Sequence, residues 1–292
     1  MDGVVLIDKP AGCTSHDIVN RWRRLAGTKR VGHLGTLDPM ATGLLALISG
    51  RGTRLAQFFG GEEKTYLAEI RFGVVSDTFD AEGETVPTGA VIPGLECVRE
   101  AAERFRGSFS QTPPSYSAKK ISGVPAYKLA RANKPVDLKP VEVFVRRLEI
   151  GDLQGDQLQL TITCSAGTYI RSLANDLGAE LGCGAILSGL RRTEVGRFQL
   201  TQAKTLEQLA LLADCGKLTE ALIPLNELLP HIPAAQFDEL AVSRIRQGRE
   251  FRTSPFVVPP GARHVRALSR SGDLVAIGEL QLPNVYHPAI VL

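Results

Sequence analysis

The sequence predicts an α+β fold, in which a mixed, mainly antiparallel sheet is flanked by helices. Apolar and polar residues alternate over residues 64–72 and 157–164, as in strands with one buried face. Apolar residues recur at helical spacing between Thr14 and Gly27 and again over residues 170–181. Because strand-like and helix-like segments follow one another irregularly, the pattern favours α+β over regular βαβ winding.

The N-terminal part begins with a short apolar strand at residues 3–8. Thr14 or Ser15 caps the helix that follows, and Gly27 ends it. Residues 31–54 are rich in glycine, so we expect this stretch to be mostly loop with one short helix.

The middle of the chain is predicted to contain a helix at residues 97–106 and a strand at residues 141–150. Residues 111–139 lie between them, are rich in proline and show no clear period. We therefore expect a long excursion there rather than a core element.

The sequence changes in character toward its C-terminal end. A helix is predicted at residues 235–247, and a hairpin is predicted from Val265 to Leu280. These elements indicate a small β-rich domain. We therefore divide the chain into residues 1–228 and residues 229–292.

The composition is that of a globular protein, with 22% charged residues and a mean hydropathy of +0.01. No apolar run approaches the roughly 20 residues that span a bilayer. Asp2 stands where a signal peptide would be basic. The five cysteines include no Cys-x-x-Cys pair, which argues against a disulfide framework and a structural zinc site. We expect a cytoplasmic protein.

The charges are segregated along the chain. Arg21–Arg54 holds seven basic residues and one acidic residue, and Lys119–Arg147 holds eight basic and two acidic ones. Glu62–Arg104, between them, holds ten acidic and four basic residues. Tyr116 and Tyr127 accompany the second basic cluster, and aromatic rings among cations are typical of RNA sites. Nucleic acid is the expected partner, although charges that cancel across the surface are the alternative.

Asp38 is the first candidate for chemistry. It lies in the segment Gly32–Gly43, whose three glycines allow another molecule to approach the backbone closely. An acid in such a segment, within a basic region, is a candidate nucleophile or general base. A capping aspartate before the helix-opening Pro39 is the alternative, and the local sequence leaves both open.

Two further side chains have a functional and a structural interpretation. Arg171 begins the helix at residues 170–181, and the apolar spacing directs it away from the centre of the buried stripe. It could pair with a carboxylate and keep it ionised, or it could be a surface arginine. Tyr66 could stack on a nucleobase, or it could pack in the core.

Neither a metal nor a cofactor site is predicted. His33 has no histidine or cysteine nearby, so it is a poor metal ligand. Asp77 and Asp80 predict a turn with local hydrogen bonds, because the glutamate that closes a calcium-binding EF-hand loop is missing. No Walker A segment and no Gly-x-Gly-x-x-Gly segment after a strand is present.

Four segments occur in a fixed order: Ile7–Ser15, Gly32–Gly43, Gln111–Lys120 and Gly167–Leu173, the last followed by Leu190-Arg191-Arg192-Thr193. Lys64-Thr65-Tyr66 lies between the second and the third segment. Together they resemble the pseudouridine synthases that modify uridine-55 in the T-loop of bacterial tRNA. The resemblance covers about residues 3–198. It implies the pseudouridine synthase fold and an isomerase that works without a cofactor or metal, on the T-arm of tRNA.

The resemblance also implies roles for individual residues. Asp38 would be the nucleophile that starts exchange of the N-glycosidic bond for a C–C bond, with attack on the base or on the ribose left open. Arg171 would be its ion-pair partner. Tyr66 would stack on the target uracil and help move the proton lost from C5. Tyr169 and Leu190 would line the uridine pocket.

His33 matches a residue that takes up space in the opened T-loop stack. Residues 111–139 resemble the family's RNA-gripping insertion, and residues 229–292 resemble a small RNA-binding domain of the PUA type. We expect a monomer that flips uridine out of the RNA stack. An RNA-guided synthase that works with partner proteins, or an RNA chaperone with little catalysis, remains the alternative.

Overall fold

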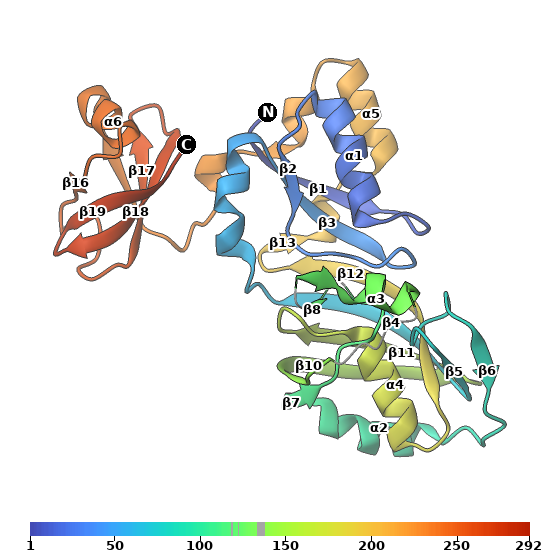
Figure 1. The fold of residues 1–292 in the computed structure, drawn as a ribbon. Helices are drawn as coiled ribbons and strands as arrows, with labels where there is room; N and C mark the ends of the chain where they lie inside the picture. Colours follow the sequence, from blue (N-terminus) through green and yellow to red (C-terminus); the bar gives the residue numbers. More distant parts are fainter. Residues whose placement is uncertain (118, 122, 133–137) are drawn as a thin grey trace.

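The computed structural model describes residues 1–117, 119–121, 123–132 and 138–292. Most of these residues form a large sheet and its helices, and a second, smaller sheet lies near the end that carries the N-terminus (Figure 1). The strands of the large sheet are β1 (Gly3–Lys9), β2 (Val31–His33), β3 (Thr42–Ser49), β4 (Lys64–Phe72), β7 (Gly107–Gln111), β10 (Val141–Gln154), β11 (Gln157–Cys164), β12 (Ala185–Val195), β13 (Phe198–Gln199) and β14 (Leu222–Ile223).

The strand order β14-β1-β3-β12-β4-β11-β10-β7 makes the large sheet mixed and mainly antiparallel, which confirms the predicted fold class. The pairing of β12 with β3 is parallel, whereas β12 pairs with β4 antiparallel. Strand β12 therefore joins the half of the sheet built from β1 and β3 to the half built from β4, β11 and β10.

Helices and small hairpins accompany the sheets. The helices are α1 (Ser15–Ala26), α2 (Leu95–Ala102), α3 (Ala126–Arg131), α4 (Ile170–Glu180), α5 (Leu206–Asp214) and α6 (Glu239–Arg246), with short 3-10 helices at Gly50–Phe59, Glu103–Phe105, Leu200–Gln202, Leu218–Ala221 and Leu225–Glu227. The hairpins are β5 (Val74–Ser76) with β6 (Thr85–Pro87) and β8 (Lys120–Ile121) with β9 (Val124–Pro125). Among the residues described, no helix is both long and apolar enough to cross a membrane.

Local sequence signals explain the first helix. Thr14 caps α1 by accepting a hydrogen bond from the backbone N–H of Asp17, whose carboxylate accepts from the N–H of Thr14 in return. Gly27 ends the helix in the left-handed conformation. The fully buried Trp22 packs the inner face against the sheet. The predicted helix is confirmed with its capping residues.

The prediction that residues 31–54 are mostly loop is wrong. This stretch forms β2, β3 and the start of a 3-10 helix, and β3 is buried along nearly its whole length. The error arose because a strand buried on both faces has a continuous apolar run instead of an alternating one. Gly43 looked like a loop signal, but a Cβ there would collide with the carbonyl oxygen of Arg192, so glycine permits the close parallel pairing.

Four other predicted elements are confirmed. Residues 64–72 and 157–164 form β4 and β11 as expected, the strand at 141–150 is β10, and the helix at 97–106 is α2 with its 3-10 extension. Strand β12 was not predicted. The excursion at 111–139 contains β8, β9 and α3, while residues 118, 122 and 133–137 lie outside the described residues.

The C-terminal sheet has the order β15-β17-β18-β19-β16. Its strands are β15 (Ala234–Phe237), β16 (Phe251–Arg252), β17 (His264–Ser269), β18 (Leu274–Leu282) and β19 (Val285–Val291). The predicted hairpin is confirmed as β17–β18. The helix expected at 235–247 begins later, because Ala234–Phe237 pairs with β17 and Asp238 caps α6. The domain division at residue 228 stays a prediction, since one apolar core unites residues of both sheets.

Candidate active site

A cavity of about 390 Å³ opens where the two halves of the large sheet meet. Its wall includes all six residues that the sequence and the resemblance singled out, namely His33, Asp38, Tyr66, Tyr169, Arg171 and Leu190. They come from the end of β2, from the β2–β3 loop, from β4, from the N-terminus of α4 and from β12. The fold thus gathers into one cavity residues that lie as far apart in the chain as 33 and 190.

The loop that carries Asp38 is held on both sides. Ser15, at the start of α1, donates its hydroxyl to the carbonyl of Leu37 at 3.0 Å and accepts from the Leu37 N–H at 2.8 Å. Lys9, whose side chain is fully buried, donates its ammonium to the carbonyls of Pro39 at 3.1 Å and Ala41 at 2.7 Å. Both neighbours of Asp38 are therefore fixed, which leaves its carboxylate to point into the cavity.

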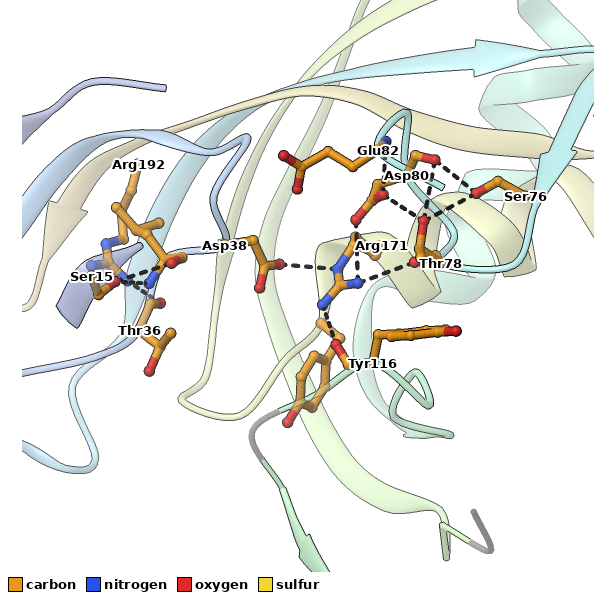
Figure 2. A network of polar contacts seen from close by, with 12 residues as sticks. Ser15, Thr36, Asp38, Ser76, Thr78, Asp80, Glu82, Tyr116, Arg171 and Arg192 are labelled. Carbon is orange, nitrogen blue, oxygen red and sulfur yellow. Dashed lines mark hydrogen bonds and ion pairs between the residues drawn. The ribbon is translucent and has the colours of Figure 1, made fainter. Parts of the chain in front are cut away.

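Arg192 holds the part of the loop that precedes Asp38. Its buried guanidinium donates to the carbonyl of Thr36 at 3.2 Å (Figure 2). It also donates to the carbonyls of Gly35 at 3.0 Å and Leu44 at 2.8 Å. These bonds tie the loop to β12 and β3, and they satisfy a charged side chain that would be costly to bury unpaired.

Arg171 links Asp38 to a second carboxylate (Figure 2). Its Nε lies 2.9 Å from Oδ2 of Asp38, an ionic contact without hydrogen-bond alignment, and its Nη1 lies 3.2 Å from Oδ2 of Asp80. It also donates to the carbonyls of Thr78 at 3.1 Å and Tyr116 at 2.9 Å. The side chain is only 6% exposed, so the alternative of a surface arginine is wrong. Its acceptors come from three separate segments, which the helical spacing alone did not indicate.

Asp80 is the principal site residue that sequence reasoning missed. The predicted turn is present, since Asp80 accepts from the hydroxyl of Thr78 at 2.6 Å and from the N–H of Glu82 at 3.0 Å. Its other oxygen faces Arg171, and its side chain is 4% exposed. Phe79, with φ 63°, places the turn against β12 through backbone bonds to Leu187. This burial arises from distant segments, so the local sequence contains no signal for it.

The first turn of α4 is fastened to the base of the insertion. The buried amide of Gln111 donates to the carbonyl of Tyr169 at 3.0 Å and accepts from its N–H at 2.8 Å. The hydroxyl of Ser172 donates to the carbonyl of Thr112 at 2.8 Å. With the bond from Arg171 to Tyr116, these contacts set the position of the guanidinium relative to the cavity.

The remaining predicted residues differ in exposure. Tyr66 is 7% exposed, and burial raises the pKa of its phenol to about 12, so it is neutral at pH 7. Burial also raises the pKa of Tyr169. His33 lies exposed at the rim of the cavity, where the cavity walls and then the charge of Arg192 lower the pKa of its imidazole. Leu190 is half-buried on β12.

The environment of Asp38 acts on its ionisation in two directions. The cavity removes much of its water and raises the pKa of the carboxyl above the ordinary 3.8, and the charge of Asp80 adds to this. The guanidinium of Arg171 and the ammonium of Lys9 lower the pKa. The balance is a raised pKa, and the side chain keeps 35% of its exposure, toward the cavity.

This shift predicts a pH-dependent gain of stability in Asp38→Asn. A raised pKa means that ionised Asp38 is less favourable in the folded than in the unfolded chain, at every pH above the raised value. Asparagine removes that cost, so the variant should unfold at higher urea concentration than the parent at pH 7, and the gain should shrink as pH falls toward 3.8. Asp152→Asn, at an exposed position of β10, is the control, and it should leave the urea midpoint unchanged at both pH values. An Asp38→Asn variant less stable than the parent at pH 7 would contradict the raised pKa of Asp38.

Some of the basic side chains at the surface form ion pairs or hydrogen bonds within the protein. In the first basic cluster, Arg51 pairs with Asp2 at 2.6 Å and Arg54 donates to the carbonyl of Val291. Arg24 and Arg30 remain exposed near α1 and β2. Within the described ranges, no three histidine, cysteine, aspartate or glutamate side chains are grouped to hold a metal ion.

Comparison with known proteins gives the same family throughout. The family model described as TruB family pseudouridylate synthase (N terminal domain) matches residues 23–170, and that of the tRNA pseudouridylate synthase B C-terminal domain matches residues 171–230. The chain is 51% identical to a protein of Solibacter usitatus (strain Ellin6076) named tRNA pseudouridine synthase B, over 100% of both chains. It is 40% identical to the protein of that name from Azoarcus sp. (strain BH72), over 96% of this chain and 92% of the other.

Solved structures support the fold independently. A chain in the structure of an H/ACA RNP bound to a substrate RNA containing 2'-deoxyuridine has a TM-score of 0.71 at 22% identity, covering 99% of this chain and 84% of that one. A chain of the archaeal box H/ACA sRNP Nop10-Cbf5 complex also has a TM-score of 0.71, at 24% identity. At this low identity the structural likeness shows the fold alone, whereas the sequence matches show the family. The protein belongs to the TruB family of pseudouridylate synthases.

Proposed function

We propose that this chain isomerises uridine-55 in the T-loop of tRNA to pseudouridine, with Asp38 as the nucleophile and without a cofactor. The observation that carries the proposal is the ionic contact of Asp38 with Arg171 inside a cavity that also contains Tyr66. A carboxylate is a useful nucleophile only when it is ionised and can form an adduct that later breaks. Arg171 favours the ionised form although the cavity disfavours it.

The reaction needs the uridine to leave the RNA stack. Flipping costs on the order of a few kcal/mol, which stacking inside the cavity offsets. Tyr66 supplies the aromatic face, and Tyr169 and Leu190 supply the remaining walls. The relatives named tRNA pseudouridine synthase B supply the substrate class, tRNA, and the resemblance to uridine-55 synthases supplies the position.

The isomerisation conserves all the atoms of the nucleotide. The bond from N1 of uracil to C1′ of the ribose breaks, the base turns within the cavity, and C5 forms a new bond to C1′. C5 then loses its hydrogen as a proton, and N1 gains one. Asp38 attacks either the base or the ribose and is released at the end, so no oxidant, reductant or metal takes part in the balance.

Tyr66→Phe separates stacking from proton transfer. The ring is kept, so we expect tRNA binding within about threefold of the parent, whereas loss of the hydroxyl should lower the rate by roughly 10²-fold, as for a general acid–base group. Because the phenol has a pKa of about 12, it is protonated in the resting enzyme. Single-turnover rates at saturating enzyme measure the effect. A Tyr66→Phe rate equal to that of the parent would limit Tyr66 to stacking.

The proposal is tested with purified chain and an unmodified tRNA transcript carrying tritium at C5 of uridine. Release of tritium, with pseudouridine mapped to position 55, is the expected result. Tight binding without release would favour a synthase that needs a guide RNA and partner proteins, or an RNA chaperone. The proposal includes a monomer that acts alone on the T-arm of tRNA in the cytoplasm.

A further inference from the structure

Lys64 lines the same cavity, and neither the sequence patterns nor the proposed mechanism gives it a role. It is the first residue of β4, two residues before Tyr66. Alternate residues of a strand project from the same face, so the two side chains lie on one side of β4, about 6.8 Å apart along the strand. Both line the cavity, where Tyr66 is buried and Lys64 is half-buried.

Lys64 has hydrogen-bond donors that remain available, whereas those of Arg171 and Arg192 are engaged within the protein. Arg171 contacts two carboxylates and two carbonyls, and Arg192 donates to three carbonyls. The Lys64 ammonium has three donors, and among the described residues it makes one hydrogen bond, to the carbonyl of Glu62 at 2.8 Å. No carboxylate in the described ranges forms an ion pair with it, and the charge of Glu62 acts on it from beyond ion-pair distance.

A second cation, the guanidinium of Arg192, lies close to Lys64. Gly35 separates the two side chains, and a Cβ at Gly35 would lie 3.1 Å from Cε of Lys64 and 3.4 Å from Nη1 of Arg192. Burial and then the charge of Arg192 lower the pKa of Lys64, and the charge of Glu62 opposes them only in part. A half-buried ammonium beside a buried guanidinium favours an anion next to both.

We propose that Lys64 binds the backbone phosphate that adjoins the flipped nucleotide, while the base of that nucleotide stacks on Tyr66. This inference rests on the proposed function, because it takes the ligand to be RNA. Tyr66 and Lys64 are two residues apart on β4. The base and the phosphate of one nucleotide are separated by a similar distance, so one nucleotide can contact both side chains. Lys64 is thus a binding residue for the substrate, and it anchors the strand from which the base is extruded.

The test removes the charge from each partner in turn. Synthetic T-arm stem-loops carry a single neutral methylphosphonate at either phosphate flanking the target uridine or at one of three other loop positions. Binding is measured with the parent, Lys64→Met, Lys64→Arg and Lys217→Met, a surface control whose lysine pairs with Glu220. Thermal unfolding checks that each variant is folded.

We expect one flanking methylphosphonate to weaken binding to the parent about tenfold and binding to Lys64→Met less than twofold. The slope of log affinity against log salt should be less steep by about one in Lys64→Met, and unchanged in Lys217→Met. Lys64→Arg keeps the charge, so it should retain both the slope and the discrimination.

A methylphosphonate scan of the parent that is flat across the loop would overturn the inference, and it requires no variant to fold. An equal penalty in the parent and Lys64→Met would overturn it as well. Turnover on the unmodified stem-loop is measured separately. If pseudouridine does not form, the proposed function fails, whereas the binding data still decide for or against the phosphate contact.

Discussion

Asp38→Asn is expected to lower the single-turnover rate of pseudouridine formation by about 10⁴-fold or more, which is the scale of losing a catalytic nucleophile. The amide keeps nearly the same volume, but it cannot form the transient covalent bond. The fixed backbone on both sides of residue 38, held by Ser15 and Lys9, should keep the cavity intact. Binding of tRNA should therefore stay within about threefold of the parent.

Tritium release and filter binding measure the two quantities on one RNA preparation. Asp152→Asn makes the same chemical change at an exposed position on β10 and should leave both unchanged. Turnover by Asp38→Asn at even one tenth of the parent rate would show that another group starts the reaction. Loss of binding together with turnover would instead assign Asp38 to recognition of the RNA.

Arg171→Met is expected to reduce both activity and stability. Asp80 would remain buried without its charge partner, and breaking such a pair typically costs about 3–5 kcal/mol. Asp38 would lose the cation that favours its ionised form, so the rate at pH 7 should fall by roughly 10³-fold and its acid limb should move to higher pH. Urea unfolding and a pH–rate profile measure the two effects.

Arg171→Met/Asp80→Asn separates the two contributions. The second change removes the stranded carboxylate, so it should restore most of the free energy of unfolding while activity stays low. Arg191→Met is the matched control, because Arg191 forms a more exposed pair with Asp8 at 2.7 Å and should cost less than about 1 kcal/mol. A double variant that regains activity would show that Arg171 acts only on folding.

The elements that the sequence predicted correctly are those whose signal is local. The capping pair of Thr14 and Asp17 and the alternation along β4 are legible in short windows. Strand β3 was missed because a strand buried on both faces shows no alternation of apolar and polar residues. Its glycine, Gly43, looked like a loop signal, but it allows close contact with the backbone of Arg192. Strand β12 pairs with β3 and β4, which come more than 100 residues earlier, so no short window shows its position.

The site was predicted in part. Local sequence left Asp38 and Arg171 each with two interpretations, and the resemblance favoured the functional ones, which their 2.9 Å contact supports. Asp80 and Lys64 gain their meaning from neighbours that the chain brings together only on folding. For Asp80 that neighbour is Arg171, and for Lys64 it is the loop at Gly35 and the buried Arg192.

The contacts between α4 and the base of the insertion set a limit for shortening the protein. Gln111, Thr112 and Tyr116 hold Tyr169, Ser172 and Arg171 through bonds made before the hairpin β8–β9 begins. We therefore expect a shortened chain without the hairpin and α3 to keep these bonds, provided that the cut lies beyond Ser117. Deletions that start earlier remove the residues that hold the guanidinium of Arg171. Two deletions whose starting points differ by only a few residues should therefore have different effects: one weakens RNA binding, and the other also abolishes catalysis.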